Sequence, residues 1–144
     1  MIEAIITAET AQDMIGYTLD GHVEISTIIF ECTPPAVGVI MAALAGELSI
    51  LARGVLLQTL SFVAAGSGDY EPDTEGASLG DECRHHAEEG FWGLAQIGLT
   101  GSADDAETVA DICEYFGLGG DKAAFYQAQL RERMRSKTKR GRRV

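Results

Sequence analysis

Cysteine is scarce in this sequence, and no two cysteines lie close together. Cys32, Cys83 and Cys113 are odd in number, and no CxxC occurs. That pattern argues against a disulfide framework and predicts thiols buried as small apolar side chains in a reducing compartment. The first ten residues, MIEAIITAET, have an acidic residue where a secretory signal peptide carries positive charge. We therefore expect a cytoplasmic or virion-associated protein that is not secreted through a signal peptide.

Basic side chains are nearly absent from the first 130 residues. This part carries 21 acidic side chains and only three basic ones, a balance of −18. Residues 131–144 carry eight basic side chains against Glu132, a balance of +7, which gives the whole chain a net charge of −11. An acidic body with a basic C-terminal end indicates docking, either on acidic protein surfaces or on nucleic acid.

Motifs for catalysis and for cofactor binding are also missing. The sequence GLGG, residues 117–120, has no clear strand before it and no Lys-Ser or Lys-Thr after it, which excludes a phosphate-binding loop. Cys83 lies beside His85 and His86, but close neighbours along one helix seldom point at each other. Cys113 lies on an apolar stripe, which is typical of a core residue. The sequence therefore predicts a protein that is not an enzyme and needs no cofactor.

The first 32 residues predict a small β-containing unit. The stretch EAIITAE is short and rich in β-branched residues, and Asp20-Gly21 is the commonest signal of a short hairpin turn. After that turn, apolar residues alternate with polar ones. Thr10, with Asp13 three residues later, leaves a short helix over AQDMIGYTL open as the alternative.

An almost continuous apolar segment, residues 36–65, follows Pro34 and Pro35 and predicts one long helix, since proline is tolerated in a first helical turn. Glu47 and Arg53 divide this segment into apolar runs of about fourteen residues, shorter than the roughly twenty that a membrane span needs. We therefore interpret it as a central core helix, with membrane insertion as the weaker alternative. The two charges do not pair along one helix, so each needs another partner, and a contact between symmetric copies is one solution.

Small residues recur along this predicted helix. Gly38, Ala42 and Gly46 lie four residues apart, and Gly54 follows two such steps later. A row of small residues lets a second backbone approach closely, so these positions predict a packing face, either within the fold or across a dimer.

Three further helices are expected in the second half of the chain. Residues 66–78, GSGDYEPDTEGAS, predict an acidic surface loop, after which Ser78 begins a helix that runs to about Leu99. Ser102 begins the next helix, with acidic residues in its first turn, and GLGG ends it. Asp121 begins the last helix, which ends near Lys137. Its apolar positions recur every four residues, at Tyr126, Leu130 and Met134.

These elements predict an α+β protein that is predominantly α. A single domain would cover residues 1–137, with a small N-terminal β-hairpin unit over residues 1–32 and a bundle of about four helices over residues 34–137. Residues 138–144 would form a basic C-terminal arm.

The densest group of metal-ligand side chains is DECRHHAEE, residues 81–89. Glu82, His85, His86 and Glu89 lie three and four positions apart, so a helix would place pairs of them on one face. Glu-x-x-His is also the spacing of carboxylate-bridged di-iron bundles. The only acid of the apolar helix would be offset by roughly 20 Å in a simple hairpin, at about 1.5 Å per residue, which argues against such a site. We favour a polar first helical turn with two surface histidines, and a metal site is the alternative.

Taken together, these observations predict a non-enzymatic structural or interaction protein that forms a homo-oligomer or joins a larger assembly, by analogy with the assembly proteins of viruses and phages. A membrane is not expected as a partner, and nucleic acid is a second candidate through the basic end. The alternatives are an acidic inhibitor that mimics nucleic acid, a nucleic-acid-associated accessory protein and, less favoured, a metal-dependent enzyme using Glu82, His85 and His86. The predicted partner-binding residues of the basic end are Arg135, Lys137, Lys139, Arg140, Arg142 and Arg143.

Overall fold

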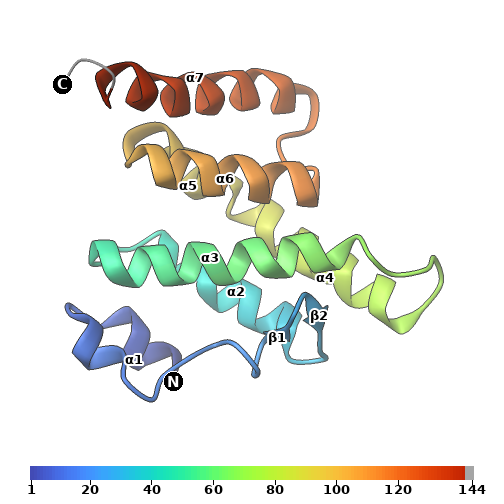
Figure 1. Cartoon of the computed structure of the whole chain (residues 1–144). Helices are drawn as coiled ribbons and strands as arrows, with labels where there is room; N and C mark the ends of the chain where they lie inside the picture. Colours follow the sequence, from blue (N-terminus) through green and yellow to red (C-terminus); the bar gives the residue numbers. More distant parts are fainter. Residues whose placement is uncertain (142–144) are drawn as a thin grey trace.

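A computed structural model describes the backbone of residues 1–141 and, apart from Ile25 and residues 136–141, their side chains (Figure 1). Within these residues the chain forms seven α-helices, two short 3₁₀ turns and two strands of two residues each. The prediction of a predominantly helical bundle is confirmed. The helices are α1 (Ile2–Ile6), α2 (Thr33–Leu44), α3 (Ile50–Ser67), α4 (Glu75–Glu89), α5 (Phe91–Thr100), α6 (Ala103–Phe116) and α7 (Ala123–Gly141).

The predicted N-terminal β-hairpin unit is wrong. The segment EAIITAE lies mostly in helix α1, because Ile5 lies three residues after Ile2, a helical spacing, and Ile5 is fully buried. Asp20-Gly21 does not join two strands. The short strands are β1 (Glu24–Ile25) and β2 (Ile28–Ile29), which pair antiparallel on either side of Ser26-Thr27.

The alternative offered by Thr10 is closer to the structure. The Asp13 carboxylate accepts a hydrogen bond from the backbone N–H of Thr10 at 2.8 Å, the capping arrangement that the spacing predicts. The turn that follows is a 3₁₀ turn, Ala11–Met14, and not an α-helix over AQDMIGYTL.

The single long helix predicted over residues 36–65 is also wrong, since α2 and α3 are separate. Ser49 ends the break between them by capping α3: its Oγ accepts a hydrogen bond from Ala52 N at 3.0 Å and donates one to Ala8 O at 2.6 Å. Because the Ser49 side chain bonds to the backbone of both Ala52 and Ala8, it favours the start of a new helix over the continuation of α2.

The helix predicted from Ser78 onward likewise consists of two helices. Thr74, not Ser78, caps α4, and α4 ends at Gly90, where α5 begins in a new direction. A Cβ at Gly90 would overlap the Met41 side chain, so glycine here lets α2 approach the junction closely.

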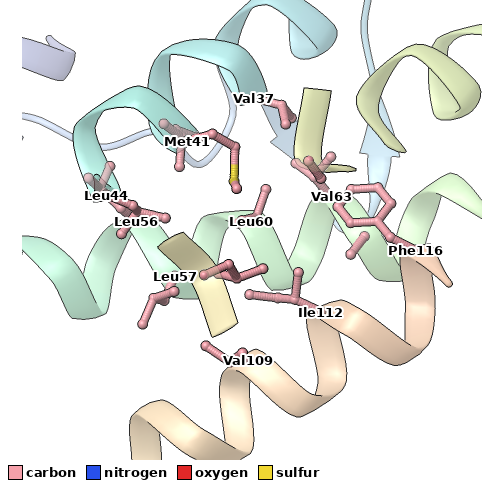
Figure 2. Close-up of a cluster of buried hydrophobic side chains, with 14 of the residues drawn as sticks. Val37, Met41, Leu44, Leu56, Leu57, Leu60, Val63, Val109, Ile112 and Phe116 are labelled. Atoms are coloured by element: carbon pink, nitrogen blue, oxygen red, sulfur yellow. The ribbon is translucent and has the colours of Figure 1, made fainter. Parts of the chain in front are cut away.

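Helix α3 lies in the middle of the fold, with α6 and α7 on one side and α2 and α1 on the other (Figure 1). Its buried residues pack against α2 and α6, as Figure 2 shows. Among the described residues, α3 is the one helix whose length and composition would suit a membrane span, a test that the core helix of a soluble protein also passes. The core side chains labelled in Figure 2 are Val37, Met41, Leu44, Leu56, Leu57, Leu60, Val63, Val109, Ile112 and Phe116.

The two C-terminal helices follow their predicted boundaries at three of four ends. Ser102 caps α6 in a capping box with Asp105, and α6 ends at Gly117, which adopts a left-handed conformation with φ of 65°. Helix α7 starts at Ala123, close to the predicted Asp121. Its far end differs, because the helix continues past Lys137 to Gly141, so that four residues of the predicted arm are helical.

Candidate interaction surface on the α6–α7 hairpin

Helix α7 is fixed to the body by the apolar face that the sequence predicts. Leu130 is buried, and Tyr126 and Met134 pack partly buried against the same core. Gly98 of α5 allows this close approach, because a Cβ there would overlap the side chains of Leu130 and Val109. The packing therefore determines which face of α7 points to solvent.

Two polar contacts set the register of α7 against its neighbours. Gln127 Nε2 donates a hydrogen bond to Ala110 O of α6 at 2.8 Å. Arg133 Nη2 donates to Gly101 O, directly after α5, at 2.6 Å, and places a cation near the carbonyl end of that helix, where positive charge is favourable. Because Gly101 precedes α6 and α7 runs antiparallel to α6, the backbone beyond Arg133 continues past the start of α6.

The outer side of α6 carries a row of carboxylates that we call the acidic stripe: Asp104, Glu107, Asp111 and Glu114. They lie three, four and three positions apart and so share one face of the helix. Partial burial raises the pKa of Asp111 above its usual value, and the negative charges of Glu107 and Glu114 raise it further. The stripe is therefore a surface on which added positive charge is favourable.

The first cations of α7 lie beside this stripe. Arg131 Nη2 lies 3.2 Å from Glu114 Oε2, and both side chains are more than half exposed. Such a pair is screened by water and salt and contributes on the order of 0–1 kcal/mol. A shallow hollow of about 460 Å³ opens next to it, lined by Glu107, Arg131, Met134 and Arg135.

We call the stretch of α7 from Arg131 onward the cationic end. Of the predicted partner-binding residues, Arg135 is exposed, and Lys137, Lys139 and Arg140 lie in the last turns of α7. Arg142 and Arg143 lie outside the described residues. The structure thus presents the basic charges up to Arg140 on a helix and not on an extended arm.

The four small residues predicted to form one packing face do not share a helix. Gly38 is half-buried in α2, where a Cβ would lie 3.5 Å from the His86 ring, so it packs within the fold. Ala42 is exposed on α2, and Gly46 lies in the break between α2 and α3. Gly54 is exposed on α3 with open space around its Cα. The break after α2 separates positions that a continuous helix would have aligned.

The predicted metal cluster is centred on Glu89. Glu89 Oε1 lies 3.7 Å from His85 Nε2, and Glu89 Oε2 lies 3.5 Å from His86 Nδ1. Glu82 is exposed in the middle of α4, not in its first turn. Over the part of the chain that the structure describes, no group of three or more His, Cys, Asp or Glu side chains is placed to hold a metal ion.

Sequence reasoning missed the partner of Arg53. Its Nη2 lies 3.0 Å from Asp105 Oδ2, so α3 is tied to the start of α6 within one chain. Glu47, the partner considered for a contact between copies, is exposed in the break between α2 and α3. Asp105 is one of the acidic residues expected in the first turn of this helix, but only the tertiary arrangement brings Arg53 to it.

The fold and this surface define a small, mainly helical protein with opposite charges on the two helices of a C-terminal hairpin. No protein-family model matches the chain, and neither curated proteins nor solved structures give a significant match.

Proposed function

We propose that this chain is a non-enzymatic interaction protein whose cationic end docks on an acidic surface in an assembly, the acidic stripe of a second copy being the first candidate. The observation that carries the proposal is the contact of Arg133 with Gly101, which directs the following backbone of α7 past the start of α6. Lys137, Lys139 and Arg140 follow this anchor point in the last turns of α7.

The acidic stripe provides a surface of opposite charge on the same molecule. Glu107 and Asp111 are exposed, and the pairing of Arg131 with Glu114 gives an example of the contact that a second cationic end would make. Electrostatic pairing of this kind contributes to orientation and association rate more than to affinity. We therefore expect a salt-sensitive association.

The decisive experiment is the molar mass in solution, measured by sedimentation velocity at low and high salt. Raising the salt from about 0.1 M to 1 M shortens the Debye length from about 10 Å to about 3 Å, so the proposed oligomer should dissociate. A chain truncated after Lys137 should be monomeric at both salt concentrations. A truncated chain that assembles as the full chain does would overturn the proposal.

A matched variant separates charge from helix length. Replacing Lys139, Arg140, Arg142 and Arg143 by glutamine keeps the number of residues and a good helix former at each position. It should behave as the truncated chain does, whereas Lys122→Gln, outside the cationic end, should assemble normally. Glu107→Gln with Asp111→Asn tests the acceptor and should also weaken assembly.

Nucleic acid is the competing partner, and the same variants distinguish it. A monomeric chain that binds duplex DNA, with binding lost in the glutamine variant and falling steeply with salt, would replace the protein surface by phosphate as the docking partner. The body's excess of acidic residues would repel such a polymer, which favours the protein partner.

A further inference from the structure

A cleft remote from the α6–α7 hairpin lies between the N-terminal segment and one side of α3. Its volume is about 550 Å³, within the range of about 300–1,000 Å³ that is usual for small-ligand sites. The N-terminal segment contributes residues 14–27 in part, and α3 contributes Val55, Gln58, Thr59 and Phe62. None of these residues belongs to the surface proposed above for assembly.

The charged side chains that line the cleft are all acidic. Asp20 and Glu24 contribute carboxylates, and among the lining residues that the structure describes there is no lysine or arginine. Glu24 is only 4% exposed. Its Oε2 accepts a hydrogen bond from Thr27 N at 3.0 Å. A carboxylate this deeply buried is stabilised by a second donor or a positive charge.

Aromatic side chains stand on both sides of the cleft. Tyr17 comes from the N-terminal segment and Phe62 from α3, and they are 48% and 44% exposed. Aromatic faces attract cations and also provide apolar contact for a ligand's hydrocarbon part. The lining thus combines negative charge with aromatic surface.

The wall of the cleft near Glu24 is held in an unusual conformation. Ser26 and Thr27 have φ values of 49° and 73°, in the left-handed region that a β-branched residue such as Thr27 rarely adopts. The turn is pressed against α3 at Gly66, where a Cβ would overlap the Thr27 carbonyl. Backbone strain of this kind is typical of ligand clamps, since the surrounding structure has to maintain it. Here it presents the Thr27 N–H to Glu24.

We propose that this cleft binds a small organic cation, an amine or guanidinium group joined to an aromatic or apolar part. The positive group would approach the Glu24 carboxylate, with Asp20 nearby, and the apolar part would lie between Tyr17 and Phe62. Hydroxyl groups of Thr18, Ser26 and Thr59 line the same space and supply hydrogen-bond partners.

Three probes of one shape test the charge preference: phenethylamine as the cation, 2-phenylethanol as its neutral analogue and phenylacetate as the anion. Each is titrated into the ¹⁵N-labelled full chain and followed by NMR. Phenethylamine should shift amide signals of the cleft residues and bind at least about tenfold more tightly than the other two, a difference of about 1.4 kcal/mol. Equal binding of the neutral probe, or no shifts at the cleft with phenethylamine, would overturn the proposal.

Variants locate the binding. Glu24→Gln keeps an oxygen that accepts the Thr27 N–H bond but removes the charge, so it should weaken phenethylamine binding at least about tenfold. Asp20→Asn, at an exposed position, tests the charge without disturbing a buried group and should weaken it less. Asp69→Asn, in the loop after α3, is the matched control and should bind as the unaltered chain does. Unchanged binding in both cleft variants would place the cation elsewhere.

The chain also carries its own cations, so a peptide of residues 136–144 is the last arm of the experiment. A peptide that displaced phenethylamine and shifted the same cleft signals would assign the cleft to residues 136–144 of the chain and overturn its assignment to a small molecule. A peptide without effect on these signals supports the small-molecule site. The chain truncated after Lys137 retains the cleft. Phenethylamine binding can therefore be measured whether or not the full chain assembles.

Discussion

The guanidinium of Arg53 and the carboxylate of Asp105 form a largely buried ion pair that joins α3 to α6. Arg53 Nη2 lies 3.0 Å from Asp105 Oδ2, with 27% and 11% of the two side chains exposed. The same Oδ2 accepts a hydrogen bond from Ser102 N at 2.8 Å, while Ser102 Oγ accepts one from Asp105 N at 3.0 Å. One carboxylate therefore caps α6 and neutralises a cation on the central helix.

Asp105→Ala should be strongly destabilising because it removes both functions. Loss of a capping residue costs about 0.5–2 kcal/mol, and breaking a fully buried pair costs about 3–5 kcal/mol. Arg53 retains partial contact with water, so we expect a total loss of about 2–4 kcal/mol in the free energy of unfolding, measured by urea denaturation. Glu107→Ala, an exposed acid on the same helix, should change the stability by less than about 0.5 kcal/mol.

A double-mutant cycle with Arg53→Met tests the pairing itself. Once Arg53 is absent, Asp105→Ala removes only the cap, so its cost should fall to about 0.5–2 kcal/mol. Equal costs of Asp105→Ala in both backgrounds would show that the two charges do not interact.

Local signals in the sequence were sufficient where one short segment determines the structure. Ser102, followed by acidic residues in the first turn, predicted the start of α6, and the apolar spacing of Tyr126 and Leu130 predicted the buried face of α7. The break between α2 and α3 was missed because hydropathy alone continues across it, whereas Ser49 bonds to the distant residue Ala8.

The N-terminal error and the candidate cleft have a related cause. Isoleucine-rich EAIITAE has strand propensity, but burial of Ile5 in the core fixes it as a helix, and tertiary contacts override such propensities. The cleft was not predicted because it forms between residues 14–27 and α3, which are distant in sequence. The acidic stripe, by contrast, has a spacing of three and four residues that the sequence alone displays.

Two glycines of α3 should respond in opposite ways to the same substitution. Gly66→Ala would force a Cβ onto the Thr27 carbonyl, and a backbone group cannot move aside as a flexible side chain can, so we expect a loss of about 1–3 kcal/mol. Gly54→Ala adds its Cβ to open space on an exposed helical surface and should raise the stability by about 0.5–1 kcal/mol. Thermal and urea unfolding of the two variants provide the comparison. A stabilising Gly66→Ala would mean that the turn at Thr27 does not press on α3.

Asp111→Asn should stabilise the protein at neutral pH. The pKa of Asp111 is raised in the fold by partial burial and by the neighbouring charges of Glu107 and Glu114, with Arg131 acting in the opposite direction. The fold thus disfavours the charged carboxylate. The stability that protonated Asp111 contributes is complete below its pKa in the unfolded chain and is lost as the pH rises through its pKa in the folded chain. Removing a like charge should add about 0.2–0.5 kcal/mol per pair at pH 7. At pH 3, where the carboxyl is protonated in both states, the variant and the unaltered chain should unfold alike.

The three cysteines should differ sharply in reactivity. Burial raises the pKa of the Cys83 thiol to about 12, helped by the charge of Glu82, and burial alone raises the pKa of Cys113 to about 12. Cys32 is exposed. Because the thiolate is the reactive form, labelling with a disulfide reagent at pH 8 should modify one thiol per chain quickly in the native protein and three after denaturation.

The same two thiols should make the fold sensitive to alkali. Both pKa values lie above the usual value of 9.0. The contribution of the two neutral thiols to stability is therefore complete below about pH 9 and is lost as the pH rises toward 12. Replacing Cys113 by alanine keeps a small apolar side chain in the core and removes its ionisation, so the variant should lose less stability between pH 8 and pH 11 than the unaltered chain. Cys32→Ala is the control and should retain the full loss. The free energy of unfolding is measured by urea denaturation at each pH. An equal loss in all three proteins would show that the buried thiols do not cause the alkaline sensitivity.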